Sequence, residues 1–475
     1  MKISEKKAIA ILIASLFFGL YSCDTSIIPE GNDAEFTHFE FVYMQNSPII
    51  DRANNTIYAE IDSVVDVSSL ITSFVLTHGA TAYIESTVQQ SGISENDFTR
   101  IVEYKIVSEN KSTVNNWRVT ISKISVPQQN NTDFTFASNT SIPAGTYYMN
   151  GTITIADNVY FVLQPGVKII LGPDAKFSVG NKACFIAKGT AEQPIIFTSE
   201  TSKWDGFVFN NTDEVEFQYC KFDNAGKQNL QFIKVNNSNI GISYSEFTNI
   251  GCTCFLLDNN SAFRVFDNNI LTDVAHNDNA YPIVFNSINS ASNIGENNII
   301  SSKGILITNG MITNNITLIG QTCPYVLEDD IRCTNVDVTF FIRSGVTILM
   351  NEGKEIFLGN SRMVFKAEGT ETKPIIFKGN SAETVAGFWK GFSINGYILP
   401  GSNFTHCQVY DAGNGSNTGA IKCDRTDLSR LTIQNCMIKN TKSHGIYFTK
   451  NSNAKLNGNN NIIVASPYQE IFYEE

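Results

Sequence analysis

Two stretches far apart in the chain decide the fold because they repeat each other. Residues 161–170 read FVLQPGVKII, and residues 340–349 read FFIRSGVTIL. Two more segments follow in the same order in both copies: KGTAEQPIIF at 188–197 matches EGTETKPIIF at 368–377, and WDGF at 204–207 matches WKGF at 389–392. The offset grows along the chain, which indicates insertions between matched strands. The second half of the protein therefore repeats the lobe that precedes it.

A shorter period lies inside each lobe. An apolar residue followed two places later by Asn or Asp returns every 24 to 29 residues, as Phe222/Asn224, Phe247/Asn249, Leu271/Asp273, Val409/Asp411 and Ile438/Asn440. A unit of this size cannot bury its own apolar face, so successive units must stack as coils. Asn suits the turns because it tolerates the left-handed conformation and can hydrogen-bond the Asn of the next coil. Asp273 and Asp411 are therefore interpreted as structural.

The order of GVKIIL, GT…PIIF and WxGF resembles the opening coils of right-handed parallel β-helix proteins of the pectate-lyase-like class. The resemblance covers about residues 131 to 475. It implies an all-β chain whose solenoid consists of two duplicated lobes, at 131–315 and 316–475. Proteins of this fold carry out many functions, so the resemblance says more about fold than about activity.

The N-terminus resembles the signal peptide of bacterial lipoproteins. Residues 8–20 are an unbroken apolar run, too short to span a bilayer, and LYSC at 20–23 resembles a lipobox. The resemblance implies that residues 1–22 are removed, that Cys23 is acylated, and that the protein is anchored to the bacterial outer membrane, facing the cell surface. Residues 23–34, polar with Pro and Gly, are expected to form a tether.

Short alternating strands between residues 35 and 125 predict a small β-sandwich. Trp117, Val119 and Ile121 point one way in the last of these strands, while Arg118 and Thr120 point the other. The run from Gln89 to Ile106 resembles the Ig-like module that often follows the lipid anchor in surface lipoproteins of Bacteroidota. Such modules serve mainly as spacers.

The net charge of the chain excludes one class of binding partner. The formal net charge is −12 at pH 7, so no excess of basic residues is available to neutralise phosphates, and no nucleic-acid partner is expected.

Apart from Cys23 the chain has nine cysteines, which cannot all pair. Cys323 and Cys333 are close in sequence and are the predicted disulfide, since exported proteins permit one. The remaining cysteines are predicted to be buried thiols; no metal site is predicted, and a monomer is expected.

The β-helix resemblance raises polysaccharide cleavage as a hypothesis. Lyases of this fold hold calcium with carboxylates and remove a proton with Arg or Lys, whereas hydrolases use two or three Asp about one coil apart. Asn211–Asp213, Asp329-Asp330 and Ser443–Gly445 superficially resemble polygalacturonase motifs, but many coils separate them. No catalytic residue and no cofactor are therefore predicted. Calcium would be needed only by a lyase.

Trp204 and Trp389 occupy equivalent points of the two lobes, and two interpretations compete. The indoles could cover the core at a corner of each coil. Alternatively, both could be exposed on the same side of the rod and form a platform for a linear glycan, which Tyr147-Tyr148 and Tyr397 would extend.

The leading hypothesis for the function is non-catalytic binding of carbohydrate or another surface ligand. A polysaccharide lyase or glycoside hydrolase is the alternative, and it requires carboxylates with Arg or Lys on one face within three coils. A structural spacer or adhesin is the third hypothesis.

Overall fold

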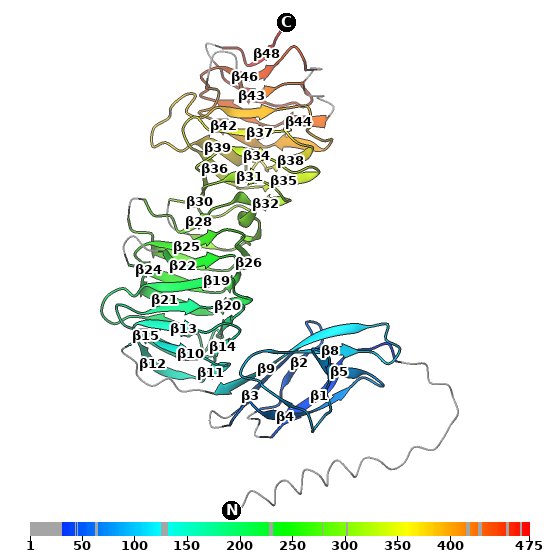
Figure 1. Ribbon diagram of the computed structural model, residues 1–475. Helices are drawn as coiled ribbons and strands as arrows, with labels where there is room; N and C mark the ends of the chain where they lie inside the picture. Colours follow the sequence, from blue (N-terminus) through cyan, green and yellow to red (C-terminus); the bar gives the residue numbers. More distant parts are fainter. Residues whose placement is uncertain are drawn as a thin grey trace, which may run out of the picture.

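The protein consists of a β-sandwich beside the base of an elongated parallel β-solenoid (Figure 1). The computed structural model describes residues 31–42, 44, 46–61, 65–124, 132–227, 231–277, 279–300, 303–414, 419–425, 430–452, 456–465 and 468–475. Cys23, the signal peptide and most of the tether lie outside these residues. Within them, no helix is both long enough and apolar enough to cross a membrane.

The β-sandwich packs two sheets around an aromatic core. Trp117, Val119 and Ile121 are all fully buried, which confirms the predicted alternation. The Phe36 ring meets the ring of Trp117 edge-on at 5.3 Å, and the indole Nε1 of Trp117 donates to the carbonyl of Ala34 at 3.2 Å. The strands of this part are β1 (Phe36–Phe41), β2 (Ile49–Asp51), β3 (Thr56–Ile61), β4 (Leu70–Leu76), β5 (Thr81–Ile84), β6 (Thr87–Val88), β7 (Glu95–Asn96), β8 (Val102–Val107) and β9 (Val114–Ile124).

One sheet runs the whole length of the solenoid. This long sheet has 14 parallel strands, each from a successive coil. Its strands are β10 (Phe134–Phe136), β13 (Thr152–Ile155), β16 (Lys176–Val179), β19 (Gly206–Asn210), β22 (Gln231–Asn236), β25 (Thr253–Asp258), β28 (Ile283–Phe285), β30 (Ile305–Ile307), β33 (Tyr325–Leu327), β36 (Thr347–Met350), β39 (Ile375–Gly379), β42 (Cys407–Tyr410), β45 (Met437–Lys439) and β47 (Ile462–Ile463).

The other two faces of the first lobe are a shared sheet and a first side sheet. The shared sheet contains β11 (Thr140–Ile142), β14 (Tyr160–Leu163), β17 (Cys184–Lys188), β20 (Glu214–Gln218), β23 (Asn239–Ser243) and β26 (Ala262–Asp267). The first side sheet contains β12 (Gly145–Met149), β15 (Val167–Leu171), β18 (Ile195–Thr198), β21 (Cys220–Ala225), β24 (Glu246–Ile250), β27 (Ile270–Val274) and β29 (Ile299–Ile300).

The second lobe has its own second side sheet and a five-stranded sheet. The second side sheet contains β31 (Gly310–Ile312), β34 (Ile331–Cys333), β37 (Glu355–Leu358), β40 (Gly391–Ile394), β43 (Gly419–Cys423), β46 (His444–Phe448) and β48 (Ile471–Tyr473). The five-stranded sheet contains β32 (Ile316–Leu318), β35 (Val338–Arg343), β38 (Met363–Glu368), β41 (Ser402–Thr405) and β44 (Leu431–Gln434).

Stacking of equivalent residues holds successive coils together. In the core, the ring of Phe222 stacks on Phe197 at 5.0 Å and on Phe247 at 4.6 Å. In the turns, the side-chain amide of Asn249 donates to that of Asn224, at 3.3 Å, and Asn440 donates to Asp411. These turn residues have positive φ. The asparagine ladder predicted from the short period is therefore present, and Asp411 is part of it.

The sandwich and the solenoid share backbone hydrogen bonds. Strand β9 pairs in parallel with β11, so the sheet of β26 to β11 continues through β9, β8 and β5 to β6. With β3, which pairs with β9, and β2, which pairs with β3, this is one 12-stranded sheet. Side chains reinforce the junction: the rings of Tyr58 and Tyr160 lie 5.6 Å apart, and Ser141 donates to Glu60 at 2.8 Å. The β9–β11 pairing and these side-chain contacts therefore fix the orientation of the sandwich relative to the solenoid.

The duplicated lobes are offset by one face around the rod. The matched stretches 166–171 and 345–350 fold into β15 of the first side sheet and β36 of the long sheet. The two WxGF motifs lead into β19 of the long sheet and β40 of the second side sheet. The short helix η1 (Ile288–Asn293) replaces a strand of the shared sheet at the transition. Residues that are equivalent in sequence therefore lie on different faces.

Candidate functional site

Trp204 and Trp389 do not form an exposed platform. Both side chains are fully buried. The indole of Trp204 packs edge-on against Phe232 at 5.0 Å, and the Nε1 of Trp389 donates to the carbonyl of Tyr410 at 2.8 Å. Because of the one-face offset, they also occupy different corners of the rod. The interpretation that they cover the core is correct, and the platform hypothesis is wrong for both.

The predicted tyrosines have different environments. Tyr397 is 61% exposed in the turn between β40 and β41, and no aromatic ring contacts it among the described residues. Tyr147 is nearly buried and its hydroxyl donates to the carbonyl of Pro143 at 2.8 Å, whereas Tyr148 is exposed on β12. Tyr397 is thus accessible but isolated.

The predicted disulfide between Cys323 and Cys333 is absent. All nine described cysteines are free and buried. Cys323 lies just before β33 of the long sheet, while Cys333 ends β34 of the second side sheet and its thiol donates to the carbonyl of Asn335 at 3.1 Å. The two side chains therefore enter the core from different faces. Burial raises the pKa of Cys323 to about 12, which leaves it a neutral, weakly reactive thiol.

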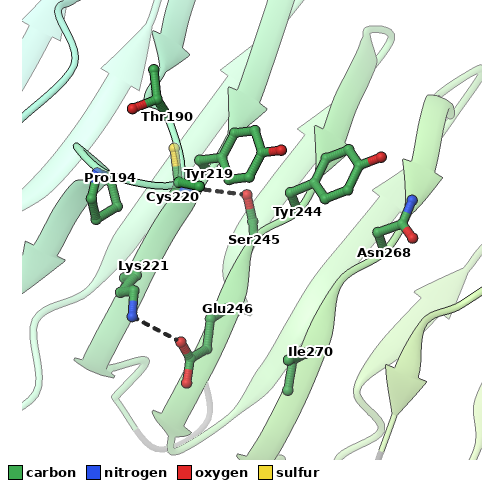
Figure 2. Close-up of a pocket in the computed structure, with 11 residues that line it drawn as sticks. Thr190, Pro194, Tyr219, Cys220, Lys221, Tyr244, Ser245, Glu246, Asn268 and Ile270 are labelled. Carbon is green, nitrogen blue, oxygen red and sulfur yellow. Dashed lines mark hydrogen bonds and ion pairs between the residues drawn. The ribbon is translucent and has the colours of Figure 1, made fainter.

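A stacked aromatic pair, one ring half-buried and the other exposed, lies at the corner between the shared sheet and the first side sheet. Tyr219 and Tyr244 follow β20 and β23, one coil apart, and both have positive φ, 48° and 51°. Their rings are nearly parallel, with centroids 4.9 Å apart and an interplanar angle of 13°. Tyr244 is 48% exposed. Figure 2 shows the two rings side by side, followed along the same corner by Asn268.

A shallow hollow of about 130 Å³ borders this pair. Thr190 and Pro194 line one end, and Asn268 and Ile270 line the other. Its polar edge is the ion pair between Lys221 and Glu246, whose Nζ and Oε2 atoms are 3.4 Å apart (Figure 2). The lining thus combines aromatic rings, hydroxyl and amide groups and the apolar side chains of Ala191, Pro194 and Ile270, a mixture suited to the hydroxyls and C–H faces of a sugar.

Hydrogen bonds fix the corner that carries the tyrosines. The hydroxyl of Ser245 accepts from the backbone N–H of Cys220 at 3.1 Å and donates to the carbonyl of Ser243 at 2.9 Å. The backbone N–H of Ser245 in turn donates to the side chain of Asn269 at 3.0 Å. The aromatic pair is therefore held on a rigid support spanning three coils.

The hollow opens onto an outward-facing row of the first side sheet. The strand register aligns Lys168, Ile196, Lys221, Glu246, Ile270 and Ile299 on successive coils. Ile270 and Ile299 are 38% and 50% exposed. The surface is thus extended along the rod axis rather than closed like a pocket for a small molecule.

The sequence contains a signal for the tyrosine pair that lies outside the Asn pattern. QYCKF at 218–222 and SYSEF at 243–247 place Tyr219 and Tyr244 25 residues apart, the length of one coil. Both occupy a left-handed turn position where the pattern favours Asn. In the second lobe the equivalent positions are His406 and Asn435. An aromatic residue repeated at a turn of the solenoid is the observation that would have identified the site.

Charged side chains also gather at the corner between the first side sheet and the long sheet. Lys227 pairs with Asp174 at 3.2 Å and with Asp205 at 3.1 Å. Partial burial would lower the pKa of Lys227, but the hydrogen bonds to Asp205 and Asp174 and their charge raise it above its usual value. Lys227 therefore stays protonated and is unsuited to act as the proton-abstracting base of a lyase. No group of acidic, His or Cys side chains able to hold a metal occurs in the described part of the chain.

The fold and its surface define a class: a β-sandwich joined to a parallel β-solenoid that carries a stacked tyrosine pair at one corner. A family model described as "SGBP, N-terminal", from the surface glycan-binding proteins, matches residues 36–121, the sandwich alone. No curated protein matches. A solved structure that matches is from Bacteroides thetaiotaomicron and is described as "a putative glycoside hydrolase". It is 23% identical over 23% of this chain, with a TM-score of 0.18, and the match spans only 28% of that protein.

Proposed function

We propose that this protein binds a glycan chain at the cell surface, along the first side sheet of its first lobe. The observation that carries the proposal is the parallel Tyr219–Tyr244 pair, half-buried at Tyr219 and exposed at Tyr244, beside an open hollow. The match of the sandwich to a glycan-binding family supports it independently. Binding without catalysis is the function this surface supports best.

The geometry favours a linear glycan lying along the rod. The tyrosine pair and the outward row from Lys168 to Ile299 run in the same direction, from coil to coil. Tyrosine offers an apolar ring to the C–H groups of a sugar and a hydroxyl to its oxygens. Tyr148, exposed on β12, lies on the same sheet and can extend the contact towards the base of the solenoid.

We expect Tyr244→Ala to weaken glycan binding about tenfold, equivalent to about 1.4 kcal/mol. The side chain is half exposed, so its removal takes away ligand contact with little loss of core packing. The measurement is native affinity electrophoresis of the purified protein through gels containing galactomannan, arabinoxylan, glycogen or polygalacturonate, with the polymer concentration varied.

Two control variants separate this surface from the other candidates. His406→Ala changes the equivalent turn position of the second lobe, and Tyr397→Ala removes the isolated exposed tyrosine. Both should bind as the unmodified protein does. Loss of binding in Tyr397→Ala, with Tyr244→Ala unchanged, would transfer the site to the second lobe. Unchanged mobility of the unmodified protein in every gel would favour a spacer or adhesin.

We also propose that the protein is anchored to the outer membrane by acylation of Cys23, as the lipobox-like sequence LYSC implies. The tether would then hold the sandwich and solenoid away from the bilayer. Cys23→Ala should shift the protein from the membrane fraction to the soluble fraction in a bacterial host that processes lipoproteins. A Cys23→Ala protein that remains membrane-bound would exclude this anchor.

A further inference from the structure

Beside the tyrosine pair, the positive charge of Lys221 is compensated by the negative charge of Glu246. Lys221 on β21 and Glu246 on β24 are directly aligned in the strand register, and both are about half exposed. Lys221 is the cation that lines the hollow. Because Glu246 also lines it, the positive charge is already matched by a partner belonging to the protein. A ligand carboxylate would have to compete with Glu246 for Lys221.

The wider surroundings are not attractive to a polyanion either. Lys168 is the other cation of the outward row, two coils from Lys221. Three carboxylates lie around these lysines: Glu246, the exposed Asp223 on the same strand as Lys221, and the exposed Glu192 in the loop beside Thr190. Asp223 also interacts with Lys203, so its charge is partly compensated. The whole chain carries a net charge of −12. The surface therefore offers an acidic polymer no local excess of positive charge, and the chain repels it at long range.

We infer, on the basis of the proposed function, that this surface selects neutral glycan chains and that Glu246 is the residue that determines this specificity. The remaining lining groups suit a neutral sugar: the hydroxyls of Thr190, Tyr219 and Tyr244, the amide of Asn268, and the apolar side chain of Ile270. Uncharged sugars offer hydroxyls and C–H faces to such groups. Glu246 acts by neutralising Lys221, so removing its charge should convert the surface to one that accepts uronic acids.

The test is Glu246→Gln in the full protein, compared by affinity electrophoresis in gels containing galactomannan, arabinoxylan, glycogen or polygalacturonate at low salt. The unmodified protein should be retarded by at least one neutral polymer and not by polygalacturonate. Glu246→Gln should be retarded by polygalacturonate at a polymer concentration at least fivefold below the highest one that leaves the unmodified protein unretarded. This gain should disappear at about 0.5 M salt, where charges are screened within a few ångströms.

Two matched variants isolate the effect of freeing Lys221. Glu192→Gln removes one exposed negative charge from the loop beside Thr190 without releasing Lys221, and it should give a much smaller gain. The double variant Lys221→Gln/Glu246→Gln should lose the gain while retaining neutral-glycan binding within about twofold. Melting temperatures close to that of the unmodified protein show that each variant is folded.

The outcomes distinguish the inference from the function on which it rests. Retardation by polygalacturonate but by no neutral polymer would overturn the inference and leave glycan binding standing. No gain in Glu246→Gln would overturn the role of Glu246. Unchanged mobility in all four polymers would remove support from the proposed function itself.

Discussion

Trp389→Ala is expected to destabilise the protein by about 3–5 kcal/mol, the usual cost of truncating a large buried aromatic residue. Trp389 is fully buried, its ring packs edge-on against Phe392 at 5.5 Å, and its Nε1 donates to the carbonyl of Tyr410 at 2.8 Å. Alanine would leave a cavity between coils and a carbonyl without its partner. The urea midpoint of the unfolding transition should fall accordingly.

Tyr397→Ala is the control for this measurement. Tyr397 belongs to the turn that follows β40 in the same lobe, and it is 61% exposed. Its replacement should change the free energy of unfolding by no more than about 0.5 kcal/mol. A Trp389→Ala protein with normal stability and lost glycan binding would restore the platform hypothesis that burial now contradicts.

The repeat pattern predicted the fold because stacking in a solenoid demands the same residue types once per coil. Phe222 and Phe247 stack in the core, and Asn224 and Asn249 form a hydrogen bond in the turn, as the period implied. The one-face offset between the lobes could not be predicted in the same way. Matching sequences show which strands of the two lobes correspond. The face of the rod on which each strand lies, however, depends on the number of strands in the segment around η1 that joins the lobes.

The candidate site was harder to predict than the fold because burial of a repeated aromatic residue is a tertiary property. A tryptophan recurs at the equivalent point of each lobe, Trp204 and Trp389, which favours a core residue but is also compatible with a ligand platform. The short sequence separation of two cysteines likewise suggested a disulfide that does not form. Cys323 and Cys333 are close along the chain, yet the chain turns a corner of the solenoid between them. The informative feature is an aromatic residue repeated at the same turn of successive coils, Tyr219 and Tyr244.

The glycine of the WxGF motif provides a second large expected effect. Gly206 has a φ of 136°, and a Cβ atom there would overlap the carbonyl oxygen of Phe232 on the next coil. Gly206→Ala must therefore move one coil away from the other, and we expect a loss of more than about 3 kcal/mol of stability, through strained backbone and overpacking combined. Thermal unfolding and the yield of soluble protein measure it.

Gly401→Ala separates the cost of backbone strain from the cost of overpacking between coils. Gly401 also has a positive φ, 89°, but a Cβ there meets no atom within 4 Å, so alanine should cost only the backbone strain of about 1–3 kcal/mol. Gly391, which equals Gly206 in the second motif, would press a Cβ against Ala420 and should behave like Gly206. Equal losses in Gly206→Ala and Gly401→Ala would show that close approach of the coils is unimportant. If the expected order holds, the motif that repeats in both lobes serves the close packing of successive coils.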